Sequence, residues 1–511
     1  MYVAALDIGT TTVRFHILDK NAITVASSSE KVKLIYPQPG YVEIDPNDLW
    51  EIIMKVIKDT LDGSKIDSRL IQSLGISSQR ASFITWSLKT GLPFHRFITW
   101  KDQRAATLVD EWNRSLIIKG LRMGSHFLYM LTKNKRFLAG SVMKFMNVQV
   151  TMKLIWVFEN ILGLRKAADK GEVAFGGVDS WFLYKLTGKH VMDTSCASAT
   201  GIFDPFTMQW AEWAINILRL PRSIFPEVVD TVGDFGITPV GMFGREIRIC
   251  CSIADQAASL FGSKCFYPGD LKITMGTGTF VNVNTGQEAH ASIKGLYPVV
   301  GWRIKNELIY IVEGSSSDTG ILVEWAKEIG LVNNAKETAD IAKKVNDSDG
   351  VYFIPAFSGL QLLFQAPINN PAAAAGFIGL KPTTKRAHIV RSLLESLVFR
   401  IIMLYNCLWE ETSFTYKNIR IDGGVSENDF VMQLLSDLTG LEVERSETVE
   451  MSILGSAFMA GLESGLWNSR EEISQLQQMK KIFKPNKDIC ISYKNTIDQW
   501  KRAVDRFKNW Y

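Results

Sequence analysis

Apolar and polar positions follow two patterns along this chain, one typical of buried strands and one typical of amphipathic helices. Near the N-terminus, residues 2–8 and 13–19 are apolar runs joined by the turn GTTT, and a third strand pattern covers 23–32. Residues 45–61 predict a helix because their apolar positions recur at helical spacing, and 71–79 predict a further strand. The first part of the chain therefore predicts strand, hairpin, helix and strand.

The same order of elements returns after residue 270. Residues 270–286 predict a strand, a Gly/Thr turn and a returning strand, and 307–315 predict another strand. A helix is expected over 319–331 and a strand over 350–355. The two halves have little sequence similarity, so what they share is the pattern of elements.

Length and composition support two domains. The chain has 511 residues, of which 46% are hydrophobic, and one core rarely grows beyond about 250–300 residues. We therefore expect an α/β protein with domains at 1–252 and 253–511 and a ligand site in the cleft between them.

Cysteine usage and charge exclude several classes of protein. Six cysteines are scattered without a C-x-x-C pair, which argues against a disulfide framework or a zinc site and favours a cytoplasmic location. The net charge of +4 is too small to suggest nucleic acid as a partner. No apolar run approaches the ~18 residues that a transmembrane helix needs.

The charge is nevertheless uneven. Between Glu111 and Glu159 the chain has no acidic residue. It has eight bases there, namely Arg114, Lys119, Arg122, Lys133, Lys135, Arg136, Lys144 and Lys153. Segment 114–153 is either a solvated basic face or a surface for anionic lipid, an anionic metabolite or an acidic partner protein.

Two Gly/Thr turns offer phosphate-binding chemistry. GTTT at 9–12 and GTGT at 276–279 place backbone N–H groups and hydroxyls at the start of each half of the chain. Asp7 suits Mg²⁺ rather than phosphate, and Arg14 supplies positive charge. Either turn alone is more often a plain hairpin, whereas the pair is more informative.

Common nucleotide signatures are absent from the sequence. There is no P-loop, no G-x-G-x-x-G and no protein-kinase catalytic loop. The segment IDGGVSEN at 421–428 suits either a ribose or ring lying against the backbone or a tight turn. In 253–262, Asp255 is either a helix N-cap or a base facing the cleft.

Taken together, these motifs resemble the FGGY carbohydrate kinases, and within them the glycerol kinases, with most similarity to a divergent animal branch. The motifs are DIGTTTVR (7–14), YPQPGYVEIDPNDLW (36–50), GISSQRASFITW (75–86), FGGVDSWFLYKLTG (175–188), ADQAASLFG (254–262), TMGTGTF (274–280), VYFIPAFSGL (351–360), GFIGLKPTTKRAHIVRSLLES (376–396), DGGVSEN (422–428) and LGSAFMAGL (454–462). The resemblance implies a two-domain actin-like ATPase fold, which is ribonuclease H-like, with ATP and substrate in the interdomain cleft.

The resemblance also implies ATP-dependent phosphorylation of a small polyol, most simply glycerol to sn-glycerol 3-phosphate. Asp255 is then the general base. The acceptor is expected to contact Arg80, Trp100, Gln256 and Phe280 together with Asp255.

For the nucleotide, the resemblance implies Mg-ATP as donor, with Asp7 on the metal. The phosphates are expected at Thr10, Thr11, Thr12, Arg14 and Thr277, and the adenosine at Gly320, Gly424 and Asn428.

Four positions depart from the pattern of the glycerol kinases. Ala81 stands where they carry a glutamate that bonds glycerol, and 144–156 lacks their pocket tyrosine. The chain has a few extra residues at 361–365, and Glu324 replaces a glutamine. The departures at Ala81 and in 144–156 weaken glycerol binding or leave room for a larger polyol.

Three interpretations stay open at this point. The chain is an active kinase for glycerol, a kinase for a different polyol or sugar, or a regulatory or scaffolding protein that binds nucleotide with little turnover. QRASFITW and ADQ argue against an actin-like or heat-shock ATPase, because such ATPases bind no small hydroxylated acceptor there. The sequence leaves open whether the chain forms a homo-oligomer.

Overall fold

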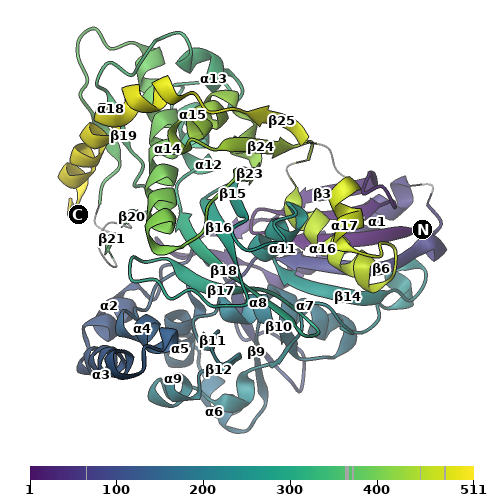
Figure 1. Cartoon of the computed structure of the whole chain (residues 1–511). Helices are drawn as coiled ribbons and strands as arrows, with labels where there is room; N and C mark the ends of the chain where they lie inside the picture. The colour runs from purple at the N-terminus through teal and green to yellow at the C-terminus, as the bar shows by residue number, and fades with distance from the viewer. Residues whose placement is uncertain (65, 363–367, 371–372, 449, 477–478, 511) are drawn as a thin grey trace.

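The fold contains two mixed β-sheets with helices packed around them (Figure 1). The computed structural model describes residues 1–510 apart from 65, 363–367, 371–372, 449 and 477–478. Most of the extra segment expected at 361–365 therefore lies outside the described residues.

The first sheet is built from the N-terminal strands. Its order is β14 (Arg248–Ala254), β6 (Ile71–Ser78), β1 (Tyr2–Ile8), β2 (Thr12–Leu18) and β3 (Thr24–Lys31). The hairpin of β1 and β2 is antiparallel, whereas β1, β6 and β14 run parallel. The predicted strands and the helix α1 (Pro46–Gly63) are confirmed, and the Asp45 side chain caps that helix.

The second sheet repeats the arrangement. Its order is β17 (Tyr297–Ile304), β18 (Glu307–Ser316), β16 (Thr279–Gly286), β15 (Leu271–Met275), β23 (Asn418–Asp422), β24 (Glu442–Ser446) and β25 (Met479–Phe483). Strands β18, β16 and β15 are successively antiparallel, and β15, β23 and β24 are parallel. This matches β3, β2, β1, β6 and β14 strand for strand, so the repeat predicted from element order extends to pairing direction.

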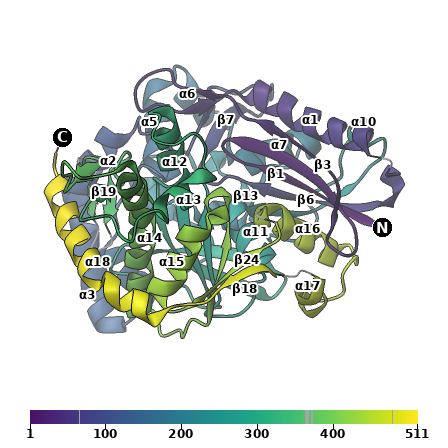
Figure 2. The same ribbon diagram turned by 90° about the horizontal axis from the view of Figure 1, so that it is seen from above.

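Two helices join the halves beneath the first sheet. They are α11 (Asp255–Gly262) and α16 (Met451–Glu463), which pack against each other and beside β6 (Figure 2). At Gly455 a Cβ atom would lie 1.8 Å from the carbonyl oxygen of Ala258, so only glycine permits this backbone approach. A helix from the second half of the chain thus covers the sheet formed by its beginning.

The helices at the lower left of Figure 1 form a separate layer. They are α2 (Ala106–Arg114), α3 (Leu116–Thr132), α4 (Lys135–Ser141) and α5 (Val150–Asn160). Helices α14 (Arg386–Glu411) and α15 (Asp429–Thr439) pack on the second sheet, and α12 (Gly320–Glu328), α13 (Glu337–Ala342) and α18 (Lys487–Phe507) pack against these two helices. Among the helices of the described chain, none is both long and apolar enough to cross a membrane.

Shorter elements complete the fold. The helices are α6 (Leu164–Asp169), α7 (Val178–Thr187), α8 (Thr194–Ser198), α9 (Glu212–Ile217), α10 (Val240–Phe243) and α17 (Arg470–Leu476). A third sheet has the order β4 (Leu34–Ile35), β5 (Glu43–Ile44), β8 (Phe97–Ile98), β7 (Phe83–Ser87) and β9 (Val173–Gly177). The remaining strands pair in twos: β10 (Val191–Asp193) with β13 (Glu227–Val229), β11 (Phe203–Asp204) with β12 (Gln209–Trp210), β19 (Tyr352–Ile354) with β22 (Gly376–Ile378), and β20 (Leu360–Leu362) with β21 (Ile368–Asn370).

Candidate active site

Asp255 lies where β14 ends and α11 begins. The N-cap position belongs to Ala254, so the Asp255 carboxylate does not cap the helix in the way the sequence also allowed. The Oδ1 atom of Asp255 accepts a 2.8 Å hydrogen bond from the N–H of Gln256. Burial raises the pKa of Asp255 to about 6, although nearby Arg80 opposes the shift. At neutral pH this group is mostly ionised, and its raised pKa makes the carboxylate a better proton acceptor than an ordinary aspartate.

Arg80 is held by a buried carboxylate from the other half of the chain. Its Nη2 donates to Oε1 of Glu313 on β18. The same carboxylate accepts 2.6 Å hydrogen bonds from the hydroxyl of Tyr297 and from Nδ2 of Asn282. Glu313 could not be recognised from the sequence, because a single acid in the apolar strand YIVEGS gives no spacing signal.

Trp100 and Phe280 come together from the two halves of the chain. Their ring centroids are 6.2 Å apart at an interplanar angle of 69°, and the Arg80 guanidinium lies 5.8 Å from the Phe280 centroid. Trp100 Nε1 donates a 2.9 Å hydrogen bond to the hydroxyl of Thr10. The two rings therefore form an apolar surface beside the first Gly/Thr turn.

Gln256 is oriented by a buried lysine that gives no signal in the sequence. The Nζ atom of Lys272 on β15 lies 3.1 Å from Gln256 Oε1 and 3.0 Å from the Ser259 hydroxyl. Because the lysine bonds the amide oxygen, it orients the side chain, and the amide N–H₂ of Gln256 can donate to an acceptor hydroxyl. Burial lowers the pKa of Lys272, which is fully enclosed.

The first Gly/Thr turn is braced by Gln79. The Thr10 hydroxyl donates to Gln79 Oε1 at 3.0 Å, and Gln79 Nε2 donates to the carbonyl of Gly9 at 3.1 Å. Thr11 is exposed and Thr12 is half-buried. The turn is therefore held by hydrogen bonds to Gln79, while the side chains of Thr11 and Thr12 remain at least partly accessible.

Asp7 and Arg14 face each other across the same hairpin. Asp7 accepts a 2.9 Å hydrogen bond from Ser77, and its Oδ2 lies 3.5 Å from Arg14 Nη1. Arg14 also forms a 2.9 Å ion pair with Glu450, which in turn contacts His16. Burial raises the pKa of Asp7, with Arg14 opposing the shift. Arg14 thus has two carboxylate partners in addition to its expected place near phosphate.

The residues at this edge fit a divalent cation. Asp7 raises the pKa of Asp255, so their two negative charges act on each other inside a buried region. Carboxylate oxygens are what Mg²⁺ prefers, and a cation here would offset the cost of burying both charges. Asp7 is the residue that would hold it.

The second Gly/Thr turn meets two glycine segments from elsewhere in the chain. The N–H of Gly320 donates to the carbonyl of Gly276 at 3.0 Å, and the N–H of Thr319 donates to the carbonyl of Thr277 at 3.1 Å. Gly423 has φ of 88°, and a Cβ there would lie 2.6 Å from the carbonyl carbon of Met275. The second Gly/Thr turn therefore lies against two other segments that were predicted to contact the nucleotide.

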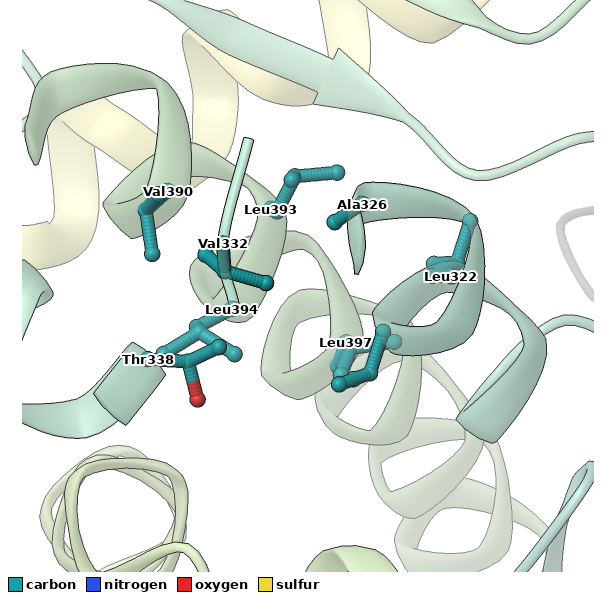
Figure 3. A pocket seen from close by; sticks show the side chains of 9 residues that line it. Leu322, Ala326, Val332, Thr338, Val390, Leu393, Leu394 and Leu397 are labelled. Carbon is teal, nitrogen blue, oxygen red and sulfur yellow. The ribbon is translucent and has the colours of Figure 1, made fainter. Parts of the chain in front are cut away.

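Asn428 has a structural task in addition to its predicted adenosine contact. Its Oδ1 caps α15 through 3.1 Å bonds from two backbone N–H groups, and its Nδ2 donates to Thr338 at 2.9 Å. Thr338 also lines a small apolar pocket between α12 and α14 (Figure 3). That cavity measures about 10 Å³, so it is packed core rather than a base-binding site. Gly424 opens the short 3₁₀ turn Gly424–Glu427 beside it.

Comparison with known proteins identifies the family. The model for the N-terminal domain of the FGGY family of carbohydrate kinases matches residues 2–262, and the model for its C-terminal domain matches 271–464. The chain belongs to this family. It is therefore a carbohydrate kinase, and ATP use follows from the family.

Individual relatives of this FGGY kinase agree with the assignment. "Glycerol kinase 5" of Danio rerio is 45% identical and covers 100% of this chain and 97% of that one. The protein of the same name from Homo sapiens is 42% identical and covers 100% and 96%. A crystal structure of Plasmodium falciparum glycerol kinase with ADP has a TM-score of 0.84 at 27% identity, covering 99% and 98% of the two chains. The predicted resemblance and the two-domain kinase fold, consistent with an actin-like ATPase, are confirmed.

Proposed function

We propose that this FGGY kinase phosphorylates a hydroxyl of glycerol or a closely related polyol. The acceptor oxygen forms a bond to the γ-phosphorus of ATP, and the bond from that phosphorus to the β–γ bridging oxygen breaks. The hydroxyl proton goes to Asp255, and ADP leaves. With glycerol as acceptor the product is sn-glycerol 3-phosphate.

The observation that supports this most directly is the state of Asp255. Its carboxylate is not used as the helix cap, its pKa is about 6, and its electrostatic neighbours are Arg80 and Asp7. Arg80, Gln256, Trp100 and Phe280 would orient the acceptor around it. Phosphoryl transfer depends mainly on such positioning and on neutralisation of charge.

For the donor, we propose that Thr10, Thr11, Thr12 and Arg14 face the phosphates from one half and Thr277 from the other. Gly320, Gly424 and Asn428 would line the adenosine. Bound Mg²⁺ would neutralise phosphate charge, with Asp7 as its protein ligand.

A coupled assay of ADP release, with glycerol and a panel of polyols and sugars, tests the proposal. We expect acceptor-dependent ADP release by the native chain and its loss in Asp255→Asn. If no acceptor raises ADP release above basal hydrolysis while MgATP still raises the melting temperature, the chain is a nucleotide-binding regulator or scaffold instead.

Two observations support testing the alternatives, namely a different acceptor and a nucleotide-binding regulator. Arg14 is already paired with Glu450, and Ala81 removes a carboxylate from the acceptor side. A different polyol or sugar that outperforms glycerol in the panel identifies the acceptor directly.

The wider assignments are proposals of the same kind. We propose domains at 1–252 and 253–511, noting that β14, the strand that ends at Ala254, pairs with the first sheet. A cytoplasmic location agrees with six free cysteines in the described part of the chain. Size-exclusion chromatography with light scattering tests for a homo-oligomer.

A further inference from the structure

A large cavity lies beside the acceptor residues. Its volume is about 1020 Å³, and its walls come from α2, α4, the segment 142–149 and the segment 292–298. Pockets for whole drug-sized ligands span about 300–1,000 Å³. The space is therefore far larger than a three-carbon polyol needs.

Tyr297 and Ser315, which both line the cavity, connect its wall to the acceptor residues. The Tyr297 hydroxyl bonds Ser315 Oγ at 3.2 Å and bonds Glu313 at 2.6 Å, and Glu313 holds Arg80. Ser315 is also the partner of Phe280 in the ladder between β16 and β18. One hydrogen-bonded wall is thus shared by the cavity and the acceptor residues.

A second connection runs through Ser198, which also lines the cavity at the end of α8. In the same helix, the Ser195 hydroxyl accepts a 2.8 Å bond from the N–H of Ala254, the residue before Asp255. Helix α8 therefore links the wall of the cavity to the residue that precedes the proposed base.

The walls suit a neutral ligand with an apolar body. Large apolar side chains dominate, including Leu121, Phe137, Phe145, Met146, Phe203 and Trp213. The charged lining residues are three acids and three bases, namely Asp110, Glu111, Asp204, Arg114, Arg136 and Lys144. Two pairs neutralise each other, since Arg136 lies 2.7 Å from Asp204 and Arg114 lies 3.0 Å from Asp110. The lining has no excess of positive charge to select an anion.

We propose that the acceptor is a glycerol carrying one apolar chain, of the monoalkylglycerol or monoacylglycerol class. This rests on the proposed function, because a glycerol hydroxyl at Asp255 receives the γ-phosphoryl group of ATP and ADP leaves. The glycerol end lies against Arg80 and Gln256, and the chain extends past Tyr297 into the cavity.

Kinetics with glycerol, 1-O-butylglycerol and 1-O-octylglycerol, below their micelle concentrations, test the proposal. We expect kcat/KM to rise at least about tenfold from glycerol to the octyl compound, as methylenes leave water. Val142→Trp, which fills the cavity, should lower the octylglycerol-to-glycerol ratio of kcat/KM about tenfold. Met143→Trp is a second filling variant, and Val25→Trp on an exposed strand is the matched control.

The outcomes separate the two proposals. Phosphorylation of glycerol with no gain from the chain, or an unchanged ratio in both filling variants, overturns the chain-binding cavity and leaves the kinase proposal intact. No transfer to any acceptor, with MgATP still bound, overturns both.

A different observation concerns α3, whose outward face is apolar. Leu116, Met123, Phe127 and Leu131 recur at helical spacing and are 84%, 70%, 57% and 67% exposed. The inward positions include the buried Ile118. A surface helix ordinarily turns its polar face to water, and exposed apolar patches of this kind mark interaction sites. In Figure 1 this helix lies at the outer edge of the molecule.

The charges around this stripe favour anionic lipid. The helix has no acidic residue, Lys119 and Lys133 are exposed on it and at its end, and no acid occurs between Glu111 and Glu159. The eight bases of segment 114–153 do not form one patch, however, since Lys153 is fully buried against the Thr99 carbonyl. Apolar side chains flanked by lysines match the interface of an anionic bilayer better than either feature alone.

We propose that α3 lies in the surface of an anionic lipid bilayer, with Leu116, Met123, Phe127 and Leu131 among the acyl chains. Leu121 on its inward side lines the cavity, so the contact would place the lipid surface next to the acceptor space.

Co-sedimentation with vesicles of phosphatidylcholine alone or mixed with phosphatidylserine tests the contact. We expect the full chain to sediment with the mixed vesicles, less at high salt, and Met123→Glu/Phe127→Glu to stay in solution. Leu92→Glu/Leu380→Glu changes two apolar side chains that are 66% and 57% exposed elsewhere and should bind as the native chain does.

Three results would overturn the lipid contact. They are absence of sedimentation at low salt, equal loss in the control variant, and a native dimer that Met123→Glu/Phe127→Glu dissociates without any vesicle binding. The last result would make the α3 face an interface between copies of the chain.

Discussion

The hydroxyl of Tyr297 donates a 2.6 Å hydrogen bond to Oε1 of Glu313. The same carboxylate holds Arg80, and Tyr297 lines the large cavity, so this chain of contacts connects the cavity wall to a residue of the proposed acceptor site. The position of Arg80 thus depends on a charge contributed by the second half of the chain.

Glu313→Gln should lower kcat/KM for the acceptor about 100-fold, because a buried guanidinium that loses its carboxylate is strongly destabilised. KM for ATP should change little, which separates the loss of Arg80 positioning from general damage. Tyr297→Phe keeps the charge and should cost much less. An equal change in both KM values, with a lower melting temperature, would instead indicate a purely structural role.

Asp255→Asn should raise the melting temperature at pH 8. Burial raises the pKa of this carboxyl from 3.8 to about 6, so its ionised form costs folding free energy. That cost is complete above the folded pKa, falls as the pH drops through about 6, and vanishes below the unfolded value. Melting curves from pH 4 to pH 8 check this, and a gain that does not depend on pH would contradict the shift.

Ala81→Glu should lower KM for glycerol by restoring a hydrogen-bonding carboxylate. Ala81 has φ of 57°, and a glutamate pays the same left-handed backbone cost, so the side chain is the only large change. About tenfold is expected for one charged hydrogen bond. Ala81→Gln is the uncharged control, and an unchanged or higher KM for glycerol would mean that the pocket is built for another acceptor.

Gly423→Ala should weaken nucleotide binding and lower the melting temperature, because the new Cβ would overlap the Met275 carbonyl beside the second Gly/Thr turn. Gly63→Ala at the end of α1 is the matched control, since a Cβ there meets no described atom within 4 Å. A Cβ at Gly424 also meets none, so Gly424→Ala tests the adenosine contact proposed for that residue. Titration with ATP, followed by thermal shift, measures all three variants. If Gly424→Ala alone reduces ATP affinity, the adenosine lies directly against Gly424.

The sequence predicted the strands, the repeated Gly/Thr hairpins and the family because these depend on local pattern and contiguous motifs. The meeting of Trp100 with Phe280 followed from the resemblance. By contrast, Glu313 and Lys272 each stand alone in an apolar strand, and their importance comes from partners that are distant in sequence. The cavity combines segments from residue 103 to residue 315, and such a convergence has no linear signature.

The apolar stripe on α3 was also hidden in the sequence. Its periodicity resembles that of any core-facing helix, and only the packed structure shows that the apolar side faces water. The absence of acidic residues makes segment 114–153 recognisable in the sequence, whereas nothing in the sequence shows that apolar residues within it are exposed.

The position of α16 has a consequence for synthesis of the chain. This helix covers β1 and β6, yet some 370 residues separate Ser78 at the end of β6 from Met451 at the start of the helix. At about 5–20 residues per second, the ribosome needs roughly 20–75 s to deliver it. During that interval the first sheet presents an uncovered apolar face in the cell. The nascent chain is therefore expected to depend on chaperones that hold it until its last tenth emerges.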